Sequence, residues 1–201
     1  GKTYVGLLTT SSIQQAQKYY ELLTKVKNGE TPLVIDEKIK QVLPDFPKFA
    51  ITYSVSENKD NSMVNQEKMK NSIDDYNSMF GTKFDISQIQ SYNGNLNKRL
   101  ARKDSKYKSR NEQLDLVIVV DRLLTGFDAP CMSTIYIDRQ PMGPHDLIQA
   151  FSRTNRIFDK NKAFGQIVTF QAPVLFKECV DNAVKLYSAG GTKESVLAEW
   201  N

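Results

Sequence analysis

The chain has 201 residues, 40% of them hydrophobic and 25% charged, so it can bury a domain-sized core and is not disordered by composition. Its net charge is only +4. The two cysteines, Cys131 and Cys179, are far apart and lack metal-ligand spacing, which is typical of a reduced protein. Neither a membrane-length apolar run nor a signal-peptide pattern is visible. We therefore expect a cytoplasmic protein with no bound metal of its own.

Short apolar runs alternate along the chain with stretches of helical periodicity. The expected strands are Tyr4 to Thr9, Phe49 to Ser54, Leu116 to Val120, Ser133 to Asp138 and Gln166 to Phe170. This alternation predicts an α/β fold in which helices cover both faces of a parallel sheet.

Three of the helices can be placed from their caps and apolar positions. The first should begin near Ser11 or Ser12, and the second should turn Met69, Ile73, Tyr76 and Phe80 inward. The last should bury Phe176, Val180, Ala183 and Tyr187 and end at Gly190-Gly191. We expect one domain over residues 1–190, and residues 191–201 should begin a following helical region, as in a piece of a longer polypeptide. The polar stretches 24–47 and 55–66 indicate no chemistry.

A basic segment precedes the third expected strand. Seven basic residues fall within thirteen positions, against the single acid Asp104: Lys98, Arg99, Arg102, Lys103, Lys106, Lys108 and Arg110. Such a run is most often a solvated face, but it is also a candidate track for a polyanion, which gives affinity without reading sequence. Lys98, Arg99, Arg102 and Lys103 are the candidate DNA contacts.

The loop after the third strand carries a second set of polar groups. Leu116 to Val120 is β-branched and uninterrupted, as in a central parallel strand, and it leads into Asp121-Arg-Leu-Leu-Thr-Gly-Phe-Asp-Ala-Pro130. Gly126 permits an unusual backbone conformation, while Thr125 and Asp128 supply a hydroxyl and a carboxylate. Ligands of open α/β sheets bind at such loops.

A stripe of polar side chains follows in Gln149-Ala-Phe-Ser-Arg-Thr-Asn-Arg156. On a helix, Gln149, Arg153 and Arg156 fall within an arc of about 60°, opposite Leu147 and Phe151. Two guanidiniums facing outward together suit a phosphate, because each can bind it bidentately and stays protonated. The alternative is an ordinary solvated face.

Together, the segments LLTGFDAP and QAFSRTNR resemble motifs V and VI of superfamily two helicases and translocases, and most closely the motor of the R subunit of type I restriction enzymes. Ser152 stands where the general motif VI, Q-x-x-G-R-x-x-R, has glycine, as in the R subunit version. The resemblance covers roughly residues 4 to 170. It implies a RecA-like fold, the P-loop NTPase-type C-terminal half of a helicase motor.

The resemblance also implies roles. Arg153 and Arg156 would contact the γ-phosphate of ATP, with Arg156 the preferred arginine finger, and Gln149 would bind or sense the nucleotide. Gly126 and Asp128 would join the nucleotide site, and Thr125 would link it to DNA. The partners implied are double-stranded DNA and the methyltransferase and specificity subunits.

This chain lacks a P-loop in its proper context, because Gly1-Lys2-Thr3 runs into a strand, and it lacks an acidic magnesium-binding box. ATP and Mg²⁺ would therefore be held mainly by a first motor domain outside this chain. Two other functions remain open. One is a non-catalytic nucleic-acid-binding module with a structural salt-bridge helix, and the other is half of another superfamily two motor.

Overall fold

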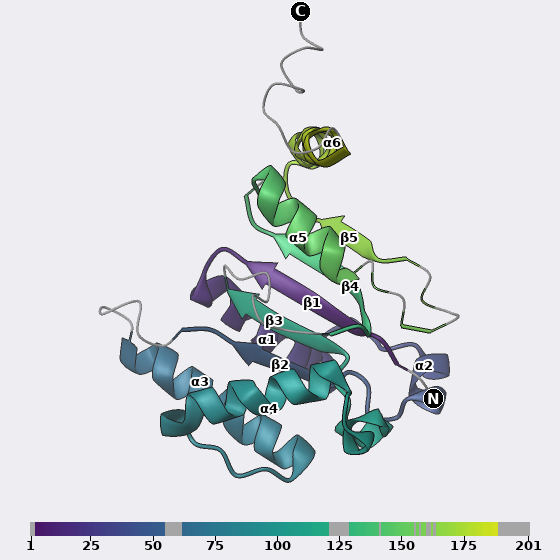
Figure 1. Ribbon diagram of the computed structural model, residues 1–201. Coiled ribbons are helices and arrows are strands. Elements are labelled where there is room, and N and C mark those ends of the chain that lie inside the picture. The colour runs from purple at the N-terminus through teal and green to yellow at the C-terminus, as the bar shows by residue number, and fades with distance from the viewer. Residues whose placement is uncertain are drawn as a thin grey trace, which may run out of the picture.

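The computed structural model describes residues 3–54, 62–120, 129–140, 142–154, 156, 158–159, 162 and 164–188 (Figure 1). The strands are β1 (Val5–Thr10), β2 (Phe49–Thr52), β3 (Leu116–Val120), β4 (Met132–Asp138) and β5 (Gln166–Thr169). The helices are α1 (Ile13–Lys27), α2 (Glu37–Val42), α3 (Ser62–Phe80), α4 (Ile89–Ala101), α5 (Pro144–Thr154) and α6 (Pro173–Ser188). Short 3-10 turns lie at η2 (Ile86–Gln88), η3 (Ser105–Lys108) and η4 (Arg110–Glu112).

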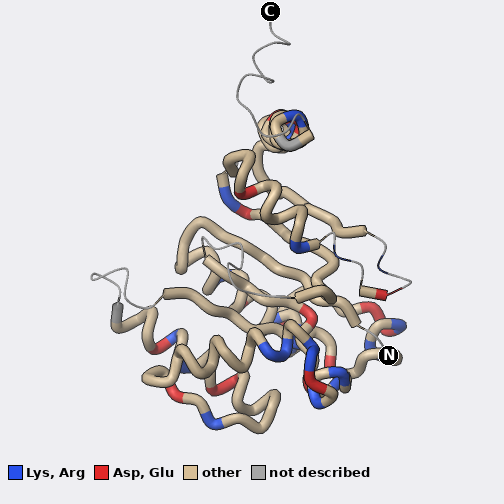
Figure 2. The backbone as a smooth tube through the Cα atoms, viewed as in Figure 1, with Lys and Arg blue, Asp and Glu red and all other residues tan. Residues whose placement is uncertain are grey.

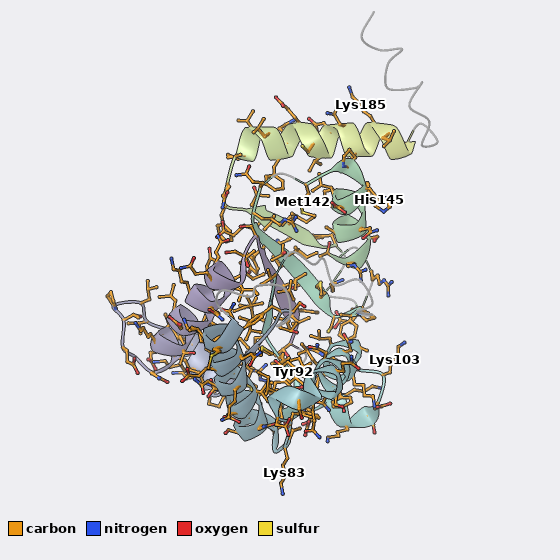
Figure 3. The ribbon with its side chains drawn as sticks, turned by 90° about the vertical axis from the view of Figure 1, so that its left-hand side faces the viewer. Lys83, Tyr92, Lys103, Met142, His145 and Lys185 are labelled. Atoms are coloured by element: carbon orange, nitrogen blue, oxygen red, sulfur yellow. The ribbon has the colours of Figure 1, made fainter. Side chains whose placement is uncertain are left out.

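The described strands form one parallel sheet in the order β2-β3-β1-β4-β5. In the centre, every residue of β1 is buried, and β1 pairs with β3 on one side and β4 on the other. Helix α1 covers one face, while α4 and α5 lie on the other (Figures 1 and 3). The predicted α/β class, with helices on both faces of a parallel sheet, is confirmed.

Helices α1 and α3 follow the sequence pattern closely. Ser12 is the N-cap of α1, and its hydroxyl accepts a hydrogen bond from the backbone N–H of Gln15 at 3.2 Å, which satisfies a donor that the helix leaves unpaired. On α3, Met69, Ile73 and Tyr76 lie in the core, as their spacing predicts.

Helix α4 was not predicted, although its apolar residues Tyr92, Leu96 and Leu100 recur every four positions and are buried. The polar and basic residues between them, and Gly94, conceal this spacing. Tyr92 lies in the interior (Figure 3), and its hydroxyl donates to the carbonyl of Ile51 on β2 at 2.8 Å. This bond ties α4 to the edge strand.

Helix α6 packs against α5 and buries Phe176 and Ala183, as predicted. The expected boundary at residues 190/191 lies outside the described residues. No helix among the described residues has the length and apolar character needed to cross a membrane.

The glycine in α4 provides a test of this helix. A Cβ built on Gly94 meets nothing within 4 Å, and the residue lies in the helix interior. Because alanine loses less backbone entropy on folding, Gly94→Ala should raise the free energy of unfolding by about 0.5–1 kcal/mol. Urea denaturation followed by circular dichroism would measure the change, and Gly6→Ala is the opposite control. A Cβ on Gly6 would lie 3.1 Å from the Tyr136 ring, so that variant should be less stable than the parent. A destabilised Gly94→Ala would contradict the α4 assignment.

Candidate functional site

Helix α5 positions the polar stripe next to the sheet. Leu147 is fully buried and Phe151 packs against the core, as expected for the apolar side of this helix. Gln149 and Arg153 are half-buried on α5, and Arg156 is exposed. The structure therefore brings the two arginines to one end of an amphipathic helix.

The stripe is not one continuous helix, and this corrects the sequence interpretation. Helix α5 ends at Thr154, two residues before Arg156. The physical reason lies in the returning chain, where the buried ammonium of Lys162 donates to the carbonyl of Thr154 at 2.7 Å and also to that of Arg156. Lys162 therefore binds acceptors that would otherwise be unsatisfied where the helix ends.

The guanidiniums of Arg153 and Arg156 are close enough to interact electrostatically. Burial lowers the pKa of Arg153, and the positive charge of Arg156 lowers it further. The guanidinium of Arg153 stays charged at neutral pH despite this shift, because arginine is not deprotonated in proteins under these conditions. The proximity of these two cations makes this end of α5 a candidate anion site.

Local hydrogen bonds order the first half of the stripe. The side-chain amide of Gln149 lies 2.8 Å from Nε2 of His145, one helical turn earlier, on the exposed side of α5. Ser152, where the helicase pattern has glycine, is exposed and donates to the carbonyl of Gln149 at 2.8 Å. The serine fits at this position because its side chain points to solvent and bonds within its own helix.

The arginine end of α5 lies at the amino edge of the sheet. The helix starts beyond the carboxyl end of β4 and runs back along it (Figure 1). Phe158, shortly after Arg156, makes an edge contact with Tyr4, which precedes β1. By contrast, β3 ends at Val120 at the carboxyl edge, and the candidate residues Thr125, Gly126 and Asp128 after it lie outside the described residues.

Arg99 occupies the interior, not a DNA-facing surface. The residue is 1% exposed, and its guanidinium carbon lies 3.6 Å from the centre of the Phe80 ring. It donates to the Tyr76 hydroxyl at 2.8 Å and to the Glu112 carboxylate at 2.5 Å. These contacts tie α4 to α3 and to η4, so Arg99 is an internal brace.

Arg102 is also buried, at 6% exposure, and its backbone adopts the left-handed conformation (φ 52°) at the end of α4. Its side chain donates to the carbonyl of Thr3 at 2.5 Å and lies 5.9 Å from the centre of the Phe158 ring. Burial lowers the pKa of Arg102. The prediction that Arg99 and Arg102 contact DNA is wrong for this structure, because the fold already uses both guanidiniums inside the domain.

Four lysines of the same segment are exposed: Lys98, Lys103, Lys106 and Lys108. We call these four residues the lysine surface. It lies at the end of α4 and on η3, where Lys and Arg positions cluster along the backbone in Figure 2, and Lys103 projects away from the domain in Figure 3. Of the four predicted DNA contacts, only Lys98 and Lys103 belong to it.

The internal brace is directly testable. Arg99→Ala should lower the free energy of unfolding by about 3 kcal/mol, because it removes a buried cation and leaves the Glu112 carboxylate without its partner. Lys103→Ala, at an exposed position of the same segment, should change it by less than about 0.5 kcal/mol. Chemical denaturation of both variants measures the difference. Equal, small effects would show that Arg99 is not structurally important.

Comparison with known proteins identifies the family to which this chain is similar. Residues 2–172 match the family model described as type I restriction enzyme subunit R domain 3. A type I restriction enzyme endonuclease subunit of Staphylococcus aureus strain COL is 32% identical over 202 residues. The corresponding subunit of Staphylococcus saprophyticus is 34% identical over 201 residues. Both alignments cover 98% of this chain and 19% of the relative.

A structure of Cas3 from T. fusca gives a TM-score of 0.38 at 12% identity, over 94% of this chain and 18% of that one. The family match covers most of the chain and agrees with the resemblance found in the motifs. The chain therefore belongs to the domain 3 family of type I restriction enzyme R subunits. It spans 19% of the length of these two relatives.

Proposed function

We propose that this domain is the second RecA-like half of an ATP-driven double-stranded DNA translocase within a type I restriction endonuclease subunit. The observation that carries the proposal is the placement of Arg153 in the last turn of α5 and of Arg156 just beyond the helix end, where burial and then the charge of Arg156 lower the pKa of Arg153. Both residues match the arginines of motif VI. The family membership supplies the context, a restriction subunit several times longer than this chain.

The residues present fit one part of a nucleotide site. Phosphoryl transfer needs a cradle for the phosphates, a metal site and a group that stabilises the charge of the transition state. Arg153 and Arg156 can supply the last of these, since their planar forks match phosphate oxygens. We propose that ATP and Mg²⁺ are held mainly by a first motor domain elsewhere in the polypeptide, and that the stripe approaches the γ-phosphate when the two domains close.

The other residues of the site take roles around the arginines. Gln149 lies one turn before Arg153 on α5, where its side-chain amide can hydrogen-bond to the nucleotide. Its hydrogen bond to His145 holds it in the helix surface until a ligand competes for it. We propose that Thr125, Gly126 and Asp128 couple this site to DNA, as their place in motif V implies.

Within the domain, DNA contacts are proposed for the lysine surface and no longer for Arg99 and Arg102. Ammonium groups on exposed side chains contact phosphates without reading bases, which suits a motor that moves over any sequence. Sequence recognition would belong to the specificity subunit, modification to the methyltransferase subunit, and the whole complex would work in the cytoplasm. A non-catalytic DNA-binding module remains the competing function, and dependence of hydrolysis on Arg156 separates the two.

The central prediction concerns Arg156→Ala in the full-length polypeptide. Binding of ATP should be nearly unchanged, because the first domain holds it, whereas DNA-stimulated hydrolysis should fall by about 10³- to 10⁵-fold, as for arginine fingers elsewhere. Arg156→Lys should recover little, since a point charge cannot replace the fork. Steady-state phosphate release and equilibrium nucleotide binding measure these effects. Normal turnover in a variant of lowered melting temperature would make the arginines a structural ion-pair face instead.

A second prediction concerns the lysine surface. Replacing Lys98, Lys103 and Lys106 with glutamine should weaken binding of the full-length polypeptide to all DNA sequences alike. The slope of log affinity against log salt should become shallower by up to about 0.9 per lost phosphate contact. A matched triple replacement of Lys25, Lys27 and Lys38, exposed lysines of the α1–α2 region, serves as control. An unchanged slope in the test variant would make the lysine surface an ordinary solvated face.

A further inference from the structure

Lys162 is an unusual residue in this fold, because it is a lysine that is only 3% exposed and its ammonium binds the backbone at the end of α5. The Nζ atom donates to the carbonyl of Thr154, in the last helical turn, and to the carbonyl of Arg156 just beyond it. A positive charge at this place also complements the negative end of the helix dipole. One side chain therefore secures both the end of the helix and the backbone of the outermost arginine.

A second close contact holds the same junction. Gly165, where the chain returns towards β5, lies directly against Thr154, and a Cβ on it would approach the Thr154 side chain to 2.2 Å. Such an approach is possible only for glycine, so the returning chain fits beneath the helix end without space for a methyl group. Lys162 and Gly165 thus fix the same turn by independent contacts.

Further contacts fix Lys162 itself. Its backbone N–H donates to the carbonyl and to the carboxylate of Asp159, at 3.2 and 3.1 Å. The same carboxylate accepts from the hydroxyl of Tyr4, the residue before β1, at 2.9 Å. We call the backbone of Thr154 and Arg156 the arginine turn. It is connected through Lys162 and Asp159 to the start of β1. Because β1 is the central strand, this anchor cannot move without disturbing the whole sheet.

Burial and the charge of Arg156 both disfavour the protonated form of Lys162. Burial lowers the pKa of Lys162, the acidic groups of Cys131 and Asp159 oppose that shift, and the charge of Arg156 adds to it. A fold that needed only a helix cap could use glycine, the common residue at helix ends, without burying a cation near the charge of Arg156. The buried ammonium is instead suited to holding the backbone of Arg156 in place against the repulsion between charges.

We propose that Lys162 is a positioning residue for nucleotide hydrolysis: its ammonium fixes the turn after α5 and so sets where the guanidiniums of Arg153 and Arg156 meet the γ-phosphate. The proposal rests on the proposed function of those arginines. Lys162 itself touches neither the nucleotide nor DNA and acts through the backbone of the arginine turn. It is distinct from the residues that motif VI contains, since it lies six positions after Arg156 in the chain.

The test uses Lys162→Met in the full-length polypeptide, because methionine fills the buried space but donates no hydrogen bond. The kcat of DNA-stimulated ATP hydrolysis should fall about 10- to 100-fold, the loss expected from a displacement of about 1 Å at a reacting centre. The KM for ATP should stay within about threefold, because ATP is bound by the first domain. The control is Lys48→Met, which removes another buried ammonium. The Lys48 ammonium donates to the carbonyl of Asn111 with a bond length of 2.9 Å, and this contact is remote from α5. The kcat of Lys48→Met should be unchanged at temperatures where the protein is folded.

A double-mutant cycle separates positioning from a simple loss of folded protein. In an Arg156→Lys background, Lys162→Met should cause little further loss, because the group that it positions is already impaired. If Lys162→Met only reduced the folded fraction, it would lower turnover by the same factor in both backgrounds, and the proposal would be overturned. Equal kcat in Lys162→Met and the parent protein would overturn it as well.

Gly165→Ala provides an independent variant if Lys162→Met does not fold. Its methyl group should displace the returning chain from Thr154 and lower kcat with little change in KM, whereas Gly94→Ala, which has room for a methyl group, should leave kcat unchanged. Normal kcat in a folded Gly165→Ala variant would count against the positioning role.

The outcome for Arg156→Ala distinguishes failure of the proposed function from failure of the positioning role. If that variant turns over normally, the arginine function fails, and if it is inactive while Lys162→Met is fully active, only the positioning role fails.

Discussion

The pairing of β1 with both β3 and β4 is the constraint on which the rest of the structure depends. β1 lies between β3 and β4, and all three strands run in the same direction. Helix α5 then has to run back along β4 towards the amino edge. The arginine turn consequently meets the start of β1, where Tyr4 and Asp159 are hydrogen-bonded. The geometry of the candidate site follows from strand order before any side chain is considered.

Among the described residues, the four candidate arginines form two pairs that differ in burial. Arg99 and Arg102 are enclosed by aromatic rings, backbone carbonyls and, for Arg99, a carboxylate, so the fold uses their charge to join α4 to its surroundings. Arg153 and Arg156 lie at a helix end where one guanidinium is exposed and the two charges repel. Removing one partner of a buried, hydrogen-bonded cation is strongly destabilising, whereas two cations near each other at a helix end form a candidate anion site.

The sequence predicted the strands well because β1 to β4 are short runs with buried apolar residues, and β5, in which no residue is fully buried, still carries three consecutive β-branched residues. Leu116 to Val120 matches the observed β3, and Ser12 caps α1 as expected. Helix α4 escaped prediction, since its polar residues and Gly94 interrupt the apolar pattern, which becomes clear only when Tyr92 is seen to contact Ile51. The family was recognisable from the segments that resemble motifs V and VI, and the family model over residues 2–172 confirms it.

Other features depend on contacts between residues distant in the chain. No local pattern distinguishes the buried Arg99 from the exposed Lys98 beside it, because the difference is made by rings on α3 and by a carboxylate on η4. The end of α5 at Thr154 was missed for the same reason. It is determined by Lys162 and Gly165, two residues that nothing in the sequence marks as partners of that helix.

The most direct test of the central claim is the structure of the full-length polypeptide bound to DNA, ADP and a planar mimic of the transferred phosphoryl group. The account predicts that the guanidinium of Arg156 lies within about 3 Å of the mimic, with Arg153 beside it and the mimic seated on another domain. A closed complex in which both guanidiniums are directed away from the nucleotide, paired with carboxylates of the same polypeptide, would contradict it.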